Sequence, residues 1–280
     1  MKSLVARINP MKESKNSSNL SFCIQKLGAF LLIYMAAAII LEGIIIGGYS
    51  ILGYDVLNGR MPEGEGIARI PFYGMAGFAI ATLLYVKYVE KRSLSEMGIT
   101  WDKKMVSSII KGIVIGAGMV TIIIGIFIAT GLGEFQGRGE ISVGSVLLWG
   151  IAYQIQSFTE EIMCRGFLQT SLSRRIKLQP AILLSSLAFM APHLFGILEI
   201  GGFTMIVSIL NLLLVSWLFS VIMIKENSLG ACCGLHFGWN FCLGTLFGLG
   251  VSGDNAVNGV VRIWVNSDHK LVTGGTYGVQ

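Results

Sequence analysis

Charged residues are scarce in this chain. Of its 280 residues, 13% are Asp, Glu, Lys or Arg, whereas 53% are hydrophobic and the mean hydropathy is +0.70. A soluble globular domain carries about a quarter charged residues. The scarcity excludes an ordinary soluble domain and predicts a protein embedded in a lipid bilayer.

Several patterns typical of other protein classes are also missing. The five cysteines form no CxxC pair and four lie within apolar segments, so we expect small hydrophobic core residues. The 36 glycines follow no G-X-Y period, which excludes collagen and favours close packing of membrane helices. HExxH is absent, which argues against a metalloprotease with both histidines on one helix turn.

Seven apolar runs are long enough to form membrane helices. The first, residues 27–52, is followed by no small-residue cleavage site, so we expect a retained anchor and not a signal peptide. The others cover roughly residues 70–86, 105–131, 143–172, 180–198, 203–224 and 229–251. The sequence predicts an all-α, polytopic transmembrane helix bundle of about seven helices, with an eighth left open.

No internal repeat, low-complexity linker or shift in composition marks a separate soluble domain. We therefore divide the chain into an N-terminal tail (1–26), the first two transmembrane helices (27–91), a membrane core (92–251) and a polar C-terminal tail (252–280). The tail after residue 251 begins on the outer side if successive loops alternate across the bilayer.

The distribution of basic residues between the loops indicates how the helices are oriented in the membrane. With the N-terminus inside, the inner segments hold fourteen Lys and Arg and the outer segments hold five. Basic residues accumulate on the cytoplasmic side of membrane proteins, so the N-terminus is expected to be cytoplasmic. The net charge of +5 is spread over short connections and not along one face, which argues against a nucleic-acid partner. We expect a multi-pass protein of the cell membrane, compatible with a bacterial plasma membrane.

Ionisable groups within the apolar runs are the candidates for function. Each costs about 2.5 to 3.5 kcal/mol to place at the centre of a bilayer, so each needs a partner or a role. The set is Glu42, Lys111, Glu160, Glu161, Arg165, His193 and His236. Glu42, in the first helix, is expected to face the interior of the bundle.

Two adjacent glutamates stand in the stretch SFTEEIMCRGFLQ. Neighbouring residues of a helix point about 100° apart, whereas Glu161 and Arg165, four residues apart, can form an ion pair. Glu161 with Arg165 is thus a candidate structural clamp, and Glu160 is free to act as a base or a ligand. The alternative is that all three residues only stabilise a helix bundle.

Two later helices carry histidines. Pro192 distorts the helix beside His193 because it cannot donate its backbone hydrogen bond. His236 and Asn240 share a helix face, between glycines that permit close approach. A carboxylate, two imidazoles and a carboxamide on three helices suit the activation of water and the binding of an oxyanion, so they indicate a hydrolase. Two His and one Glu are also ligand types of zinc, so Glu160, His193 and His236 are candidate metal ligands.

These residues resemble the CPBP intramembrane metalloprotease family, which includes type II CAAX prenyl proteases and the Abi or bacteriocin-processing and immunity proteins. The matching motifs are EExxxR from Glu160 to Arg165, FxxxH from Phe189 to His193, and HxxxN from His236 to Asn240. The similarity covers roughly residues 92–249. It is absent from the chain end, where TGGTYGVQ lacks the acidic residue and eighth helix that relatives often carry.

The resemblance implies a role for each motif residue. Glu160 and His193 would bind or activate the attacking water, while His236 and Asn240 would complete the site and steady the oxyanion. Glu161 and Arg165 would support these catalytic residues. Zinc is the candidate cofactor that the resemblance implies, and water activated by glutamate without a metal is the alternative.

The expected function is that of an intramembrane endopeptidase, acting on a hydrophobic, membrane-bound or leader-bearing peptide. One alternative is a membrane scaffold or bacteriocin immunity protein that keeps the motifs as a structural network. A transporter is a third class, for which Glu42, Lys111 and the Glu160 group would relay protons or bind a cation. No repeated half supports a transporter, and the substrate's identity does not follow from the sequence.

Overall fold

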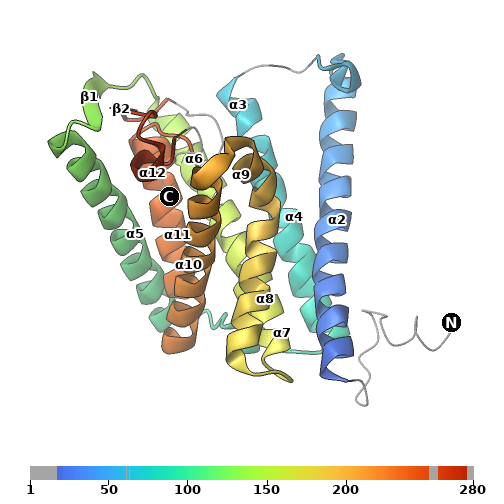
Figure 1. Ribbon diagram of the computed structural model, residues 1–280. Coiled ribbons are helices and arrows are strands. Elements are labelled where there is room, and N and C mark those ends of the chain that lie inside the picture. Colours follow the sequence, from blue (N-terminus) through green and yellow to red (C-terminus); the bar gives the residue numbers. More distant parts are fainter. Residues whose placement is uncertain (1–17, 61, 63, 252–257, 276–280) are drawn as a thin grey trace.

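The computed structural model describes residues 18–60, 62, 64–251 and 258–275, and these form a bundle of helices that stand side by side (Figure 1). The long helices are α2 (Asn19–Ile51), α4 (Ile70–Leu84), α5 (Lys103–Ala129), α6 (Val143–Glu161), α8 (Leu178–Met190), α10 (Gly202–Glu226) and α11 (Gly230–Phe241). Short helices are α3 (Glu65–Ala68), α7 (Thr170–Leu172), α9 (Leu194–Ile200) and α12 (Lys270–Thr273). The predicted all-α bundle is confirmed.

Four long helices continue into turns of other geometry. The π-helical segments are η2 (Tyr85–Val89) after α4, η4 (Ile162–Gln169) between α6 and α7, and η6 (Cys242–Leu246) after α11. The 3-10 turn η5 (Ala191–His193) joins α8 to α9, and the separate 3-10 turns are η1 (Val56–Asn58) and η3 (Leu94–Met97). Each of the seven apolar runs therefore corresponds to one helical stretch.

Five of these stretches are long and apolar enough to cross a membrane, namely Asn19–Ile51, Glu65–Val89, Lys103–Ala129, Leu178–Ile200 and Gly202–Glu226. The other two are α6 with η4 and α11 with η6. The first carries glutamines, glutamates and an arginine, and the α-helical part of the second has only 12 residues. These two helices also carry the EExxxR and HxxxN motifs.

Glycines place α11 directly against α5. A Cβ atom on Gly234 would collide with the backbone of Ile109, and one on Gly238 with the backbone of Ile113. On the facing helix, Gly112 lies in the same way against the backbone of α11. Close backbone approach through small residues is a common way for membrane helices to pack. The expected role of the glycines beside His236 is confirmed.

A network of buried charges closes the inner end of the bundle, where α2, α5, α8 and α11 begin. Glu90 accepts hydrogen bonds from Lys26 of α2 (2.6 Å) and from Arg92 (2.8 Å), and the hydroxyl of Ser171 donates to the same carboxylate. Burial raises the pKa of Glu90, but the two cations and the hydroxyl outweigh it, so the pKa lies below its usual value. The network ties α2, α4 and α7 together.

The outer end carries the only two strands among the described residues. The strand β1 (Gly133–Arg138) pairs antiparallel with β2 (Val261–Val265), so that Phe135 lies opposite Ile263. The described part of the expected polar tail thus folds back onto the loop after α5 (Figure 1), and it contains this strand and the four-residue α12. It contains no eighth spanning helix in residues 258–275.

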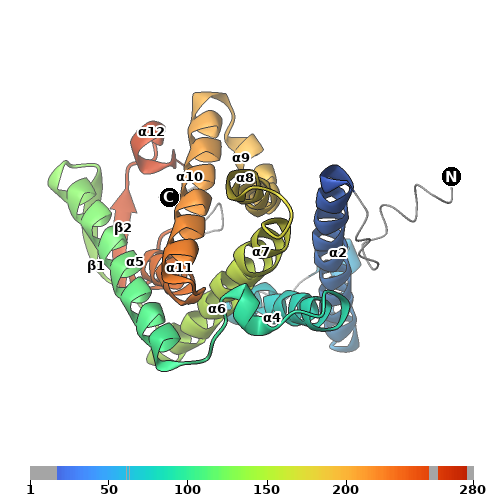
Figure 2. The same ribbon diagram turned by 90° about the horizontal axis from the view of Figure 1, so that it is seen from below.

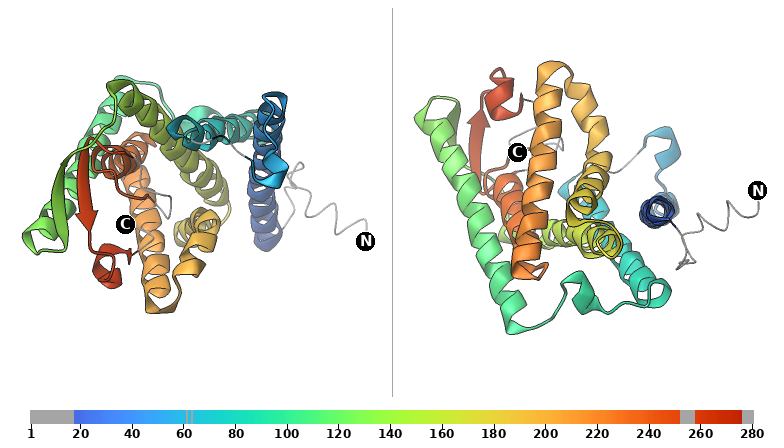
Figure 3. Two further views of the ribbon diagram at one scale, coloured as in Figure 1. Left: turned by 90° about the horizontal axis from the view of Figure 1, so that it is seen from above. Right: turned by 60° about the horizontal axis from the view of Figure 1, so that its bottom comes forward.

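The expectation for Glu42 is wrong. Helix α2 stands at the edge of the bundle beside α4 (Figures 2 and 3), and it turns Phe30 and Ala37 inward. Glu42 lies about 140° around the helix from Ala37 and is exposed, without an ion pair to any described residue. Lys111 of α5 is exposed as well. A hydropathy pattern gives the depth of a residue but not the side of the helix on which it lies.

Candidate active site

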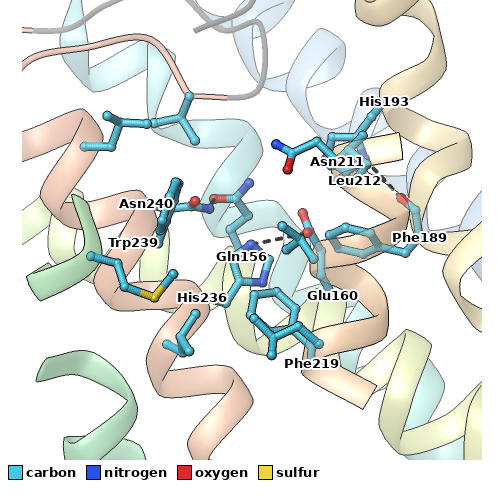
Figure 4. A pocket seen from close by; sticks show the side chains of 16 residues that line it. Gln156, Glu160, Phe189, His193, Asn211, Leu212, Phe219, His236, Trp239 and Asn240 are labelled. Carbon is cyan, nitrogen blue, oxygen red and sulfur yellow. Dashed lines mark hydrogen bonds and ion pairs between the residues drawn. The ribbon is translucent and has the colours of Figure 1, made fainter. Parts of the chain in front are cut away.

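A cavity of about 260 Å³ lies between α5, α6, α8, α10 and α11, in the middle of the bundle (Figure 4). Its walls are mostly apolar. The polar side chains that line it are Gln156, Glu160, His193, Asn211, His236 and Asn240. The four residues expected to be catalytic therefore line one cavity, although they come from three separate helices.

His236 lies between the two neighbouring glutamates. Its Nδ1 is 3.0 Å from Glu161 Oε1, and its Nε2 is 3.7 Å from Glu160 Oε2. A carboxylate only accepts hydrogen bonds, so Nδ1 of His236 carries the proton and donates it to Glu161. The two carboxylates were expected to have different roles because they diverge on the helix. Both reach the same imidazole, since α11 packs across α6 at this level.

Glu161 also forms the expected ion pair with Arg165, at 3.0 Å, and both side chains are fully buried. Arg165 donates to the Ser216 hydroxyl (2.6 Å) and to the Ser216 carbonyl (3.1 Å). Its guanidinium also lies over the ring of Phe189, at 4.5 Å from the centroid, and over Phe219 at 5.3 Å. A buried cation is tolerated only when it is paired and hydrogen-bonded, and these contacts fulfil that requirement.

Two phenylalanines connect this network to the histidines. Phe219 stacks on His236 with 5.2 Å between ring centroids and 25° between planes. Phe189, the first residue of FxxxH, contacts His193 at 5.2 Å and His236 at 6.1 Å between centroids. Both imidazoles are thus fixed by aromatic rings that also contact Arg165.

His193 lies in η5, the 3-10 turn formed at Pro192 as the sequence predicts a distortion there. Its Nδ1 is 3.0 Å from the carbonyl oxygen of Phe189. A carbonyl only accepts, so Nδ1 carries the proton and Nε2 is left as an acceptor for a water or a substrate. His193 and Asn211 both line the cavity, and in the view of Figure 4 they lie on the side away from Asn240.

Three amide side chains line the cavity: Asn240 was predicted from the helix face that it shares with His236, whereas Gln156 and Asn211 were missed by the search for ionisable groups. Asn240 donates from Nδ2 to Gln156 Oε1 at 3.2 Å, so Gln156 fixes the orientation of the Asn240 carboxamide. Gln156 stands one helix turn before Glu160 and faces the same cavity. Asn211 of α10 also faces the cavity, and it forms no hydrogen bond within the described chain. Polar residues in otherwise apolar helices were the signal that would have found them.

Glu160 is the carboxylate left free. Its Oε2 is buried and has no hydrogen-bond partner among the described residues, because 3.7 Å to His236 exceeds hydrogen-bond length. A buried, unsatisfied carboxylate oxygen beside a cavity is suited to accept a proton or to hold a water. Glu42 and Lys111 lie elsewhere on exposed helix faces and contribute nothing to the cavity.

The chemistry of two His and one Glu fits zinc, but their arrangement does not. Within the described part of the chain, no three His, Cys, Asp or Glu side chains lie close enough together to hold one ion. His236 Nδ1 is occupied by Glu161 and His193 Nδ1 by Phe189, so each imidazole offers only Nε2.

Residues 142–242 match the family model of the Rce1-like proteins, described as type II CAAX prenyl endopeptidase Rce1-like. No curated protein and no solved structure matches the chain. The matched segment contains EExxxR, FxxxH and HxxxN in full, and it begins at the N-cap of α6 and ends just after α11. The resemblance inferred from the three motifs is confirmed.

Proposed function

We propose, from the premise that residues 142–242 form a type II CAAX prenyl endopeptidase Rce1-like domain, that this chain is a multi-pass membrane endopeptidase. It hydrolyses a peptide bond in a membrane-associated or leader-bearing peptide, with a water activated by Glu160. The observation that carries the proposal is the unpartnered Glu160 carboxylate oxygen, which lies in a mostly apolar cavity beside His236.

The attack on the substrate begins with Glu160. The Glu160 carboxylate takes one proton from the water, while Nε2 of His193 accepts a hydrogen bond from the O–H that remains and orients the oxygen. The oxygen adds to the carbonyl carbon of the scissile bond, and the carbonyl oxygen becomes an oxyanion. Asn240 donates to this oxyanion with the Nδ2 hydrogen that Gln156 does not accept, and Nε2 of His236 faces the protonated Glu160 as an acceptor.

The breakdown of the tetrahedral intermediate returns the proton. The bond between carbon and nitrogen breaks, and the protonated Glu160 gives its proton to the leaving amine. The products are a carboxylic acid and an amine, and the side chains regain their starting states. Glu161 holds the His236 imidazole in place throughout by accepting from Nδ1.

A bacterial plasma membrane is the proposed location, which suits a hydrophobic or leader-bearing peptide better than a prenylated C-terminus. A scaffold or immunity protein is the second candidate, because the fully buried Glu161, Arg165 and Ser216 network would also stabilise a bundle without catalysis.

Purified protein in detergent, incubated with hydrophobic leader peptides in ¹⁸O-labelled water, tests the proposal. We expect cleavage with one ¹⁸O atom in the new carboxyl group, and no loss of rate when a metal chelator is present. Glu160→Gln should lower the rate by roughly 10² to 10⁴ without changing the melting temperature. Glu42→Gln, the same substitution at an exposed position, is the matched control. Full cleavage by Glu160→Gln would refute the mechanism, and no cleavage of any peptide by the native protein would favour the scaffold.

A further inference from the structure

The residues that line the cavity lie at different heights along their helices. At a rise of 1.5 Å per residue, His193 lies about 22 Å from the inner start of α8, and Met119 lies about 24 Å from the inner start of α5. Asn211 lies only about 14 Å from the outer start of α10. Val251, which follows the outer end of η6, also lines the cavity. The cavity therefore extends from mid-bundle toward the outer end.

The inner side of the cavity is closed by packed residues. Below Glu160, the segment η4 buries every residue from Met163 to Gln169. Arg165 and Ser216 are fully buried at this level, and Phe219 covers His236 from the same direction. A substrate cannot pass this layer without displacing a paired arginine.

A separate groove of about 150 Å³ at the inner end does not join the cavity. It is lined by Lys111, Lys225 and Glu226, between α5 and α10. Leu235 borders both this groove and the cavity, and its side chain is buried between them. The inner end is thus closed on this side as well.

The charges identify the two ends of the bundle. Basic residues gather at the inner end, where the described chain has Lys26, Lys87, Lys91, Arg92, Lys103, Lys104, Arg174, Arg175, Lys177 and Lys225. At the outer end it has Arg60, Arg69, Arg138, Arg262 and Lys270. This excess makes the inner end cytoplasmic.

We propose that the cavity is open to the extracytoplasmic side of the membrane and takes an uncharged, hydrophobic stretch of an exported or translocating peptide. None of the described residues that line it is Lys or Arg, so a free C-terminal carboxylate would find no counter-charge there. An internal peptide bond, whose flanking amides can pair with Asn211 and Gln156, fits this lining. The identity of the substrate rests on the proposed endopeptidase function, whereas the side of access does not.

Single-cysteine accessibility in intact bacterial cells tests the side of access. Asn211→Cys places a thiol in the cavity, and Met119→Cys places one there from α5 in case the first variant does not fold. Glu134→Cys, exposed at the outer end, is the outer control, and Lys177→Cys is the inner control. The native cysteines are buried except for Cys23 on the inner half of α2, which mass spectrometry separates by peptide.

A membrane-impermeant maleimide should label the cavity thiol and Glu134→Cys in intact cells, and Lys177→Cys only after the cells are permeabilised. Labelling of a folded cavity variant only after permeabilisation, or in neither condition, would overturn the proposal. So would labelling of Lys177→Cys in intact cells. The same labelling in a Glu160→Gln background is expected, because access does not require catalysis. Retained labelling of the cavity together with no peptide cleavage by the native protein would therefore refute the endopeptidase and not the side of access.

Discussion

Two carboxylates face the imidazole of His236 from opposite sides. Glu161 fixes its Nδ1 at 3.0 Å, and Glu160 faces its Nε2 at 3.7 Å. A histidine whose Nδ1 donates to a buried carboxylate keeps one tautomer, in which Nε2 is the acceptor. Glu161 therefore has two partners, His236 and Arg165, and its loss should affect both.

The substitution Glu161→Gln tests this double role. It leaves Arg165 as an unpaired buried cation, and removing one partner of a buried ion pair costs roughly 3 to 5 kcal/mol. We expect a marked fall in melting temperature in detergent, and loss of cleavage even at temperatures where the variant is folded. Glu42→Gln should change neither quantity. A Glu161→Gln protein with native stability would contradict the assigned ion pair.

Gln156 is expected to act on catalysis through Asn240. Substitution Gln156→Leu preserves approximate size but removes the acceptor of the Asn240 carboxamide, which can then rotate. Loss of one oriented oxyanion donor lowers kcat by about 10² to 10³ in other hydrolases. We expect a fall in kcat with little change in KM or melting temperature. Gln156→Glu, which keeps the acceptor, should retain more activity than Gln156→Leu, and equal activity of the two would argue against a positioning role.

At the scale of the elements, the contact between α5 and α11 positions His236 and Asn240. Gly234→Ala would place a methyl group into the backbone of Ile109, and overpacking of this kind costs roughly 1 to 3 kcal/mol. We expect a lower melting temperature together with reduced cleavage, because α11 must move away from α5. Gly43→Ala, at a helical glycine with open space around it, is the matched control and should be neutral or slightly stabilising.

The junction of α2, α4 and α7 should respond to pH. The pKa of Glu90 is lowered in the folded protein, so its contribution to stability is present above its usual value of 4.5 and is lost as the pH falls through the lowered pKa. Melting temperatures of the native protein and of Glu90→Gln should differ at pH 7 and converge as the pH falls below 4.5 and through the lowered pKa. A constant difference across this range would mean that Glu90 does not titrate as its contacts require.

At the scale of the whole molecule, hydropathy and periodicity predict most of the fold. The seven runs and the ordered motifs follow from the sequence because lipid demands long apolar helices and makes every polar residue within them conspicuous. The orientation of Glu42 does not follow, since α2 is packed on one side only. The inner network was missed because Lys26 and Arg92 were treated as reporters of topology, whereas burial at the bundle end makes them structural.

The sequence predicts most residues of the candidate site but not the contacts between them. Glu160, His193, His236 and Asn240 stand out as polar groups in apolar helices. Their geometry depends on how α11 crosses α6, which no local pattern gives. Gln156 and Asn211 could also have been predicted, because an uncharged amide at membrane depth, like a charged group, needs a partner or a role.

The wide turn η4 constrains the length of the chain between the motifs. Its i to i+5 hydrogen bonds accommodate one residue more than an α-helix would over the same rise, and such insertions are often found at functional sites. Removing a single residue from Ile162–Gln169 would let the helix return to α geometry over the same rise, but it would remove the bulge that sets where the side chains of this segment, Arg165 among them, lie relative to Glu161. Except at Arg165, related chains should therefore tolerate substitutions in this segment far better than a change in its number of residues.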